Sequence, residues 1–418
     1  MSGRRRLICA LAAGLVAMGA GCRRPAGEPD LSALVDALLP RIEVLSGLGA
    51  RRPVHMARRD VASVRRYVAA QLEKEMPPEE LAGVQAAYVA FGLLPDTLDL
   101  RRFMLDLYTE QVVGYYDAET DSLFVVEGVP ALELQPVVVH ELVHALQDQY
   151  ADLDSLIASD RGNDRSTAAQ SALEGHATLV MFAWLAETQT GRAVDPTSFP
   201  DVAAQLAPLM EQQHERFPVF RSAPRIIRET LLFPYVGGAG FVQALWRTRS
   251  GAGGAVYPAP LGDLLPVSTE QVLHPESRFL ERRDPPTELE LEPPGGDWRR
   301  VHENTLGELE ISILLSERLG RGTDTLAAGW DGDRYVLMES PQGEHVLVWY
   351  SVWDTPDSAA RFADAYRRVL SSRPGRHGEV TRIEIHGRPG VRVVDAPVAV
   401  PLKSVPAVGV VAAREGVR

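Results

Sequence analysis

The sequence predicts an α+β protein with a mainly helical larger part, one small β-hairpin, and a C-terminal module of αββαββ order. Apolar residues recur at three- to four-residue spacing through most of the first 250 residues, as amphipathic helices require. Two β-rich runs flank the turn-forming residues 117–122. Beyond residue 300, one helical pattern precedes two strand-like runs, and a second helical pattern precedes two more.

Composition supports a globular chain and excludes some partners. The 418 residues are 45% hydrophobic and 24% charged, which suits two or three packed domains. The net charge is −13. A nucleic-acid-binding protein needs a basic face, so this balance argues against a nucleic-acid partner and against electrostatic adhesion to anionic lipid.

The first 22 residues resemble a bacterial lipoprotein signal peptide. Three arginines at 4–6 precede the apolar run 7–20, and small residues then lead to Cys22. The resemblance implies export to the bacterial cell envelope and a membrane anchor through a lipid on Cys22. Ordinary cleavage with secretion is the alternative. Cys9 is the only other cysteine, so the mature chain is expected to hold no disulfide.

After a short polar tether, residues 23–110 are expected to form a helical N-terminal region. Its helical patterns cover residues 31–48, 59–76 and 76–94. Pro77 and Pro78 suit a helix start, and Gly92 suits a helix end.

The central domain is expected over residues 111–283. It begins with the hairpin at 112–126 and continues with a helix opened by Pro136. Further helical patterns cover 166–188, 198–216 and 223–249. Residues 284–300 are rich in proline and acidic residues and are predicted to be a linker before the C-terminal module, residues 301–418.

The stretch "PVVVHELVHALQDQY", residues 136–150, contains the chemistry that the sequence suggests. On a helix His140 and His144 lie 40° apart on one face, so both imidazoles can reach one metal ion. Glu141 lies beside them. Asp148 falls on the same face and is a candidate partner for a ring N–H. Two imidazoles and a carboxylate in so apolar a helix are costly to bury unpaired, and a metal ion removes that cost.

A third ligand is expected from the helix at 166–188. Some HExxH sites take their third ligand from a histidine six residues after the second, but that position is Tyr150 here. Glu174 in "ALEGHAT" is favoured, since an acid within an apolar helix needs a partner, and small neighbours let its helix approach the first closely. His176 is the alternative ligand, but on a helix it points about 200° away from Glu174.

These motifs resemble the gluzincin group of zinc metallopeptidases, which pairs HExxH with a downstream helical glutamate. A closer resemblance is to a family of largely uncharacterised secreted bacterial HExxH proteins and spans about residues 30–400. It rests on "GYYDAETDSLFVV", "HELVHALQDQ", "LEGHAT", "FPYVGGAGFV", "STEQVLHPE" and "GWDGDRY". The resemblance implies a zincin-like metallopeptidase core in which the hairpin strand before the HExxH helix lies along the substrate.

The expected function is a zinc-dependent peptidase. His140, His144 and Glu174 would bind Zn²⁺, and Glu141 would act as general base toward a peptide or protein substrate held along residues 122–126. A further donor for the oxyanion is expected from Tyr235 or His274, and less from His214. The alternative is a catalytically silent zinc-binding or scaffolding lipoprotein.

Overall fold

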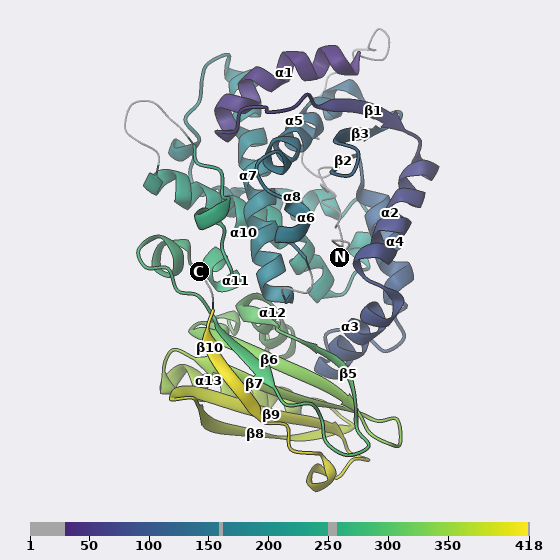
Figure 1. Ribbon diagram of the computed structural model, residues 1–418, viewed down its shortest axis with the longest axis vertical. Helices are drawn as coiled ribbons and strands as arrows, with labels where there is room; N and C mark the ends of the chain where they lie inside the picture. The colour runs from purple at the N-terminus through teal and green to yellow at the C-terminus, as the bar shows by residue number, and fades with distance from the viewer. Residues whose placement is uncertain (1–29, 159–161, 250–256, 417–418) are drawn as a thin grey trace.

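The structure is a computed structural model that describes residues 30–158, 162–249 and 257–416. It is an α+β protein, as expected, with the helical part at one end of the long axis and a five-stranded sheet at the other (Figure 1). The signal-like segment, with Cys9 and Cys22, lies outside the described residues. Within the described part, no helix is long and apolar enough to cross a membrane.

The N-terminal helices match the sequence patterns closely. Aspartates at positions 30, 60 and 99 accept hydrogen bonds from backbone N–H groups in the first turn of three of the four helices. Gly92 ends α3 in the left-handed conformation that glycine adopts without strain. The four helices are α1 (Leu31–Ser46), α2 (Val61–Glu75), α3 (Pro78–Phe91) and α4 (Leu100–Gln111).

A three-stranded sheet follows the hairpin prediction and adds one strand to it. The hairpin strands are β2 (Gly114–Asp117) and β3 (Ser122–Val126). β1 (His55–Arg59), which the sequence did not predict, pairs in parallel with β3. The order β1-β3-β2 puts β3 in the centre with both edges paired. The expectation that residues 122–126 offer an edge to a substrate strand is therefore wrong.

The helix that carries HExxH is α5 (Ala131–Asp148), and it begins before the expected start. Pro130 is its N-cap residue, and Pro136 lies inside the helix. A proline this close to the N-terminus removes only one early intrahelical hydrogen bond, so the helix continues through it. The short helix α6 (Leu153–Leu156) follows.

Two long helices cross at a pair of glycines. They are α7 (Asn163–Thr190) and α10 (Arg225–Arg249), separated by α8 (Val202–His214) and α9 (Pro218–Arg221). A Cβ built on Gly175 would lie 2.0 Å from the backbone of Gly238, and one on Gly238 would lie 1.9 Å from the Ser171 carbonyl oxygen. Gly175 thus brings α7 onto α10, and not onto the HExxH helix as expected.

The C-terminal sheet has five antiparallel strands in the order β5-β6-β7-β9-β8. The αββαββ prediction is confirmed, and β5 adds an edge strand that it lacked. The elements are β5 (Arg299–Asn304), α12 (Gly307–Leu319), β6 (Trp330–Glu339), β7 (His345–Trp353), α13 (Pro356–Ser371), β8 (Arg376–Ile385) and β9 (Arg388–Pro397).

Residues 284–300 are not merely a linker. They contain β4 (Thr287–Leu291), which pairs antiparallel with β10 (Val410–Glu415) at the end of the chain. Thr287, Leu289 and Leu291 are buried and alternate with exposed glutamates, so the period of a strand was present within the acidic composition. The connecting stretches hold η3 (Pro196–Ser198), η4 (Gly262–Leu264), α11 (Thr269–Leu273), the π-helical η5 (Glu276–Leu280), η6 (Asp324–Ala327) and η7 (Leu402–Ser404).

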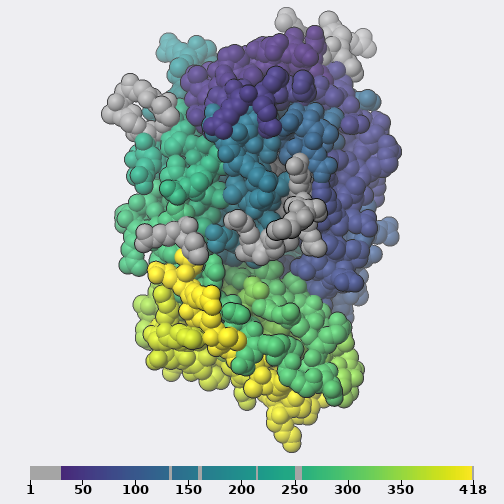
Figure 2. All heavy atoms as spheres, viewed as in Figure 1, coloured from purple at the N-terminus to yellow at the C-terminus, as the bar shows by residue number. Residues whose placement is uncertain are grey.

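The helical part and the C-terminal module share one apolar core. Side chains alternate across the sheet with the period of two that strands impose: Trp349 and Tyr335 join the main core, whereas Val348 and Val336 pack with β4. That main core runs without a break from α1 to α13. Atoms of the two parts accordingly meet across the width of the molecule (Figure 2).

Candidate metal centre

Three side chains from two helices converge at one point in the core. His140 and His144 lie one turn apart on α5, with their Nε2 atoms 3.1 Å apart. Glu174 of α7 places its Oε2 atom 3.0 Å from His140 Nε2 and 3.3 Å from His144 Nε2. All three side chains are fully buried. Among the described residues, this is the group of histidines and acids with the spacing of a metal site.

The spacing of these three atoms fits a tetrahedral metal ion. Bonds of about 2.0–2.1 Å to nitrogen and oxygen put neighbouring ligand atoms of a tetrahedron roughly 3.3 Å apart. The observed separations of 3.0–3.3 Å are close to that value. Glu174 Oε1 has no hydrogen-bond partner among the described residues, as expected of a carboxylate that binds a metal ion. Two nitrogens and one oxygen form a donor set that suits zinc.

A chain of hydrogen bonds orients the His144 ring. His144 Nδ1–H donates to Gln147 Oε1 at 2.8 Å, and Gln147 Nε2–H donates to His176 Nδ1 at 3.1 Å. His176 Nε2–H in turn donates to the Ser46 carbonyl oxygen at 3.1 Å. This order of donors occupies Nδ1 of His144 and leaves Nε2, which faces Glu174 and His140, as the atom that would bind a metal.

His176 lies where the favoured prediction placed it, whereas the expectation for Asp148 needs correction. His176, the alternative ligand, points away from the centre and belongs to the hydrogen-bond chain. Burial lowers the pKa of His176 to about 3, so the ring is neutral. Asp148 does not contact an imidazole, because it accepts a hydrogen bond from Tyr116 Oη at 3.1 Å and pairs with Arg52. Gln147, one position earlier, contacts the ring in its place.

His140, His144 and Glu174 shift one another's pKa values. Burial alone would raise the pKa of Glu174, but the two histidines outweigh it and lower that pKa to about 2. Burial likewise opposes protonation of His144, yet the Glu174 carboxylate raises the pKa of this ring to about 8. Burial lowers the pKa of His140. The carboxylate is therefore ionised at neutral pH and available to a cation.

Glu141 is the least satisfied residue of the centre. It is fully buried, and neither carboxyl oxygen has a hydrogen-bond partner among the described residues. Burial raises its pKa to about 8, and the neighbouring His144 offsets this rise only in part. A buried carboxyl group without a partner, next to two candidate metal ligands, is placed where a general base and acid would act.

Tyr235 stands beside the centre on α10. Its ring centroid lies 6.1 Å from that of His140, with the two ring planes inclined by 31°. The close crossing of Gly175 and Gly238 brings α10 near enough for this contact, since both glycines are within one turn of the residues concerned. The "FPYVGG" string thus serves to place a phenol next to a candidate ligand.

Tyr235 also lines a cavity of about 280 Å³, whose described lining does not include His140, Glu141, His144 or Glu174. Gln170, one turn before Glu174 on α7, also lines it. The remaining walls come from α2, α3, α4, α10 and α12, so the C-terminal module contributes to a cavity of the helical part. Sequence patterns could not reveal this, because the wall residues are up to 235 positions apart.

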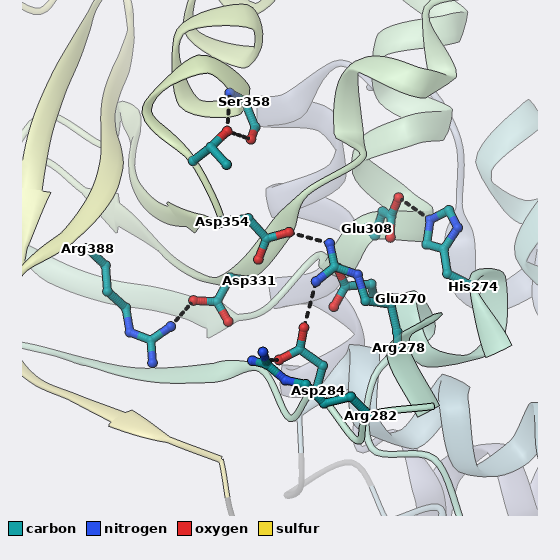
Figure 3. A network of polar contacts seen from close by, with 11 residues as sticks. Glu270, His274, Arg278, Arg282, Asp284, Glu308, Asp331, Asp354, Ser358 and Arg388 are labelled. Atoms are coloured by element: carbon teal, nitrogen blue, oxygen red, sulfur yellow. Dashed lines mark hydrogen bonds and ion pairs between the residues drawn. The ribbon is translucent and has the colours of Figure 1, made fainter. Parts of the chain in front are cut away.

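His274 and His214 are not brought to the centre. The His274 imidazole lies 2.9 Å from Glu308 Oε1 and belongs to a group of charged residues that joins the helical part to the C-terminal module (Figure 3). We call this group the junction network: Glu270, His274, Arg278, Asp284, Glu308 and Asp354. His214 is the last residue of α8, and its side chain lies outside the described part.

Comparisons with known proteins reach only the C-terminal module. Residues 296–405 match a family model described as a domain of unknown function (DUF8575), which runs from just before β5 to the end of η7. Neither the curated proteins nor the solved structures gave a match. The matched segment lies outside α5 and α7 but includes α12, which contributes to the cavity.

Proposed function

We propose that this protein is a zinc-dependent peptidase that hydrolyses peptide bonds in peptide or protein substrates. The carrying observation is the convergence of His140 Nε2, His144 Nε2 and Glu174 Oε2 next to Glu141, a buried carboxyl group without a partner. A structural zinc site needs four protein ligands and no base. Three ligands and a free carboxyl group form the arrangement of a hydrolytic site.

The residues divide the work as follows. His140, His144 and Glu174 would hold the ion, which when bound supplies a Lewis acid that acidifies water and polarises a carbonyl group. Glu141 takes a proton from the attacking water on one carboxyl oxygen and gives it to the leaving amine. Gln147 keeps His144 in the tautomer that leaves Nε2 free.

Tyr235 is the better of the two candidates for the oxyanion donor. Its ring lies against His140 and it lines the cavity, whereas His274 is engaged by Glu308. A phenol O–H donates a hydrogen bond to the negative oxygen that develops during attack on a carbonyl.

We further propose that the protein is an exported bacterial lipoprotein with a lipid on Cys22. The support is the order of arginines, apolar run and small residues before that cysteine. More than one acyl chain is needed for stable anchoring. Cys22→Ser should release the protein from the membrane fraction, and mass spectrometry of the mature N-terminus should find acyl groups on Cys22. An unmodified N-terminus from a cut elsewhere would contradict the anchor.

A second candidate is supported by the burial of the centre. His140, Glu141, His144 and Glu174 have no exposed surface, which also suits a zinc-binding scaffold without turnover. A scaffold role does not explain why Glu141 is buried without a partner, because an apolar residue there would cost less free energy of folding.

One pair of variants separates the two candidates. Glu141→Gln keeps the side-chain shape and all three proposed ligands, so zinc content should remain near one per chain while peptide cleavage falls roughly a hundred- to ten-thousandfold. His144→Ala should lose zinc and cleavage together. Zinc analysis and a peptide-library assay on both variants measure this. Unchanged cleavage by Glu141→Gln refutes the base, and zinc binding without any cleavage by the wild type favours the scaffold.

A further inference from the structure

The cavity beside Tyr235 has a one-sided charge. Its described lining includes the carboxyl groups Glu75, Glu80 and Glu310, and no lysine, arginine or histidine. Much of the remaining wall is apolar, with Met76, Leu81, Val84, Met104, Ile157 and Leu231. An acidic cavity with aliphatic walls complements a ligand that has an apolar stem and a positive end.

Glu310 is the innermost of the three acids. It is 4% exposed, and its Oε1 atom accepts hydrogen bonds from Tyr88 Oη at 2.6 Å and Asn163 Nδ2 at 2.7 Å. Its Oε2 atom is buried and has no partner among the described residues. An unpaired buried carboxylate oxygen costs free energy, and a cationic group in the cavity would remove that cost. Burial raises the pKa of Glu310 to about 7, and a neighbouring cation would favour the ionised form.

The three acids are graded in exposure. The Glu80 side chain is 44% exposed and lies near His302, so it marks the solvent side of the cavity. Tyr235 also lines the cavity and adjoins His140. A basic group that entered past Glu80 would meet Glu310 inside the cavity, and Tyr235 is the lining residue that adjoins the metal centre.

We infer that this cavity is a specificity site for a positively charged side chain of the substrate, with Glu310 of the C-terminal module as the residue that recognises it. The inference rests on the proposed peptidase function. Recognition by a buried carboxylate selects a guanidinium or ammonium group, and the apolar wall accommodates its stem. At about 280 Å³ the cavity holds one side chain and not a whole peptide.

The site lies at a distance from the scissile bond. Asn163, which binds Glu310, is eleven residues before Glu174 on α7, or about 16 Å along a helix at ~1.5 Å per residue. An extended peptide spans roughly 3.3–3.6 Å per residue. The recognised basic residue is thus expected roughly two or three residues from the cleaved bond, because its own side chain covers part of the distance.

Binding of small amides tests the site without turnover. L-argininamide and L-citrullinamide differ in charge but hardly in shape, and L-lysinamide and L-norleucinamide form the corresponding ammonium pair. By calorimetry on the purified protein, we expect the charged member of one pair to bind roughly ten- to a hundredfold more tightly. The pair that shows the preference identifies the group as guanidinium or ammonium. If the charged and uncharged members of both pairs bind the wild-type protein equally well, the inference is overturned.

Variants then assign the preference to Glu310. Glu310→Gln keeps the volume and an oxygen acceptor for Tyr88 and Asn163, and should abolish the preference. Glu308→Gln is the matched control, because it is a buried acid on the same helix that does not line the cavity. A preference that survives Glu310→Gln, or that Glu308→Gln abolishes equally, overturns the assignment.

A peptide library separates this inference from the proposed function. Cleavage with a basic residue enriched two or three positions from the cut, and lost in Glu310→Gln, supports both. Cleavage without any basic preference upholds the peptidase and overturns the specificity site. Charge-selective amide binding that depends on Glu310, with no cleavage of any peptide, upholds the cation site and contradicts the peptidase.

Discussion

The candidate metal centre and the junction network both gather buried charged side chains, but they balance charge differently. In the junction network each carboxylate faces a cation: Arg278 contacts Glu270, Asp284 and Asp354, and His274 contacts Glu308 (Figure 3). In the metal centre the nearest cationic partner of Glu174 is an imidazole, and Glu141 has no partner among the described residues.

This difference is the one expected between a structural group of charges and the proposed reactive site. Internally paired charges hold two parts of a chain in register. Unpaired buried groups lower stability, and proteins retain them where a metal or substrate completes them. Disturbing the junction network should therefore reduce stability and spare zinc binding, whereas disturbing the metal centre should affect zinc first.

The largest effect is expected from Arg278→Met, which removes the central cation of the junction network. The buried Glu270, 2% exposed, would lose its only ion-pair partner in that network. Breaking a buried pair by removing one partner costs about 3 kcal/mol or more, and urea unfolding should show that loss. Zinc content of the folded protein should not change.

Arg282→Ala is the control for this variant. Arg282 also pairs with Asp284, but its side chain is 82% exposed. An exposed pair contributes little, so its free energy of unfolding should stay within about 0.5 kcal/mol of wild type. Equal losses in the two variants would contradict the view that Arg278 stabilises the junction through burial.

The next effect is expected from Gly238→Ala at the crossing of α7 and α10. The added Cβ would lie 1.9 Å from the Ser171 carbonyl oxygen, so the helices must separate. We expect a loss of roughly 2–3 kcal/mol in unfolding free energy, together with weaker zinc binding because Glu174 moves with α7. Gly295→Ala, where a Cβ would meet nothing within 4 Å, should change neither quantity. Normal zinc affinity in Gly238→Ala would show that the crossing does not position the ligand.

A third variant tests the hydrogen-bond chain behind His144. Gln147→Met keeps the volume but removes all three hydrogen bonds of the amide, to His144, to His176 and to the Leu173 carbonyl oxygen. Loss of such a partner weakens metal binding roughly ten- to a hundredfold, and competition with a chelator should measure the change. Gln111→Met is the matched control, since the buried Gln111 amide has no partner among the described residues. Equal zinc affinity in both variants would remove Gln147 from the centre.

The convergence of His140, His144 and Glu174 could be predicted from the sequence because its geometry is largely local. Helical periodicity alone places His140 above His144, and an acid in an apolar helix indicated Glu174. Their convergence required only that two helices pack. Gln147 carried a weaker signal: it is buried on the face of His144, but glutamine also occurs often on helix surfaces.

The parts that the sequence did not predict depend on contacts between distant segments. β1 has the polar string "HMARR", which carries no strand pattern of its own, and it pairs with β3. This pairing occupies the edge of β3 that a substrate strand was expected to use. β4 is completed by β10, more than a hundred residues later. His274 was expected near the metal but meets Glu308, which no local pattern could indicate.

The smallest expected effect is a pH dependence of the junction network. Hydrogen bonding to Glu308 raises the pKa of His274, against burial and Arg278. A raised pKa in the folded state stabilises the fold fully below the unfolded value of about 6.5, and this contribution disappears as pH rises through the folded value. The stability difference between wild type and His274→Gln should therefore be larger near pH 5.5 than near pH 8.5, and under about 1 kcal/mol because the side chain is 41% exposed.

A comparison of this kind isolates His274, because the metal centre titrates equally in both proteins and cancels in the difference. His302 provides a control of opposite sign. Burial lowers the pKa of His302, so its protonation favours the unfolded state. The free energy of unfolding of His302→Gln should therefore rise relative to that of wild type as pH falls. Urea unfolding at the two pH values measures both. If the difference for His274→Gln grows toward high pH instead, then His274 does not pair as a cation with Glu308, and the junction network holds its charges in another way.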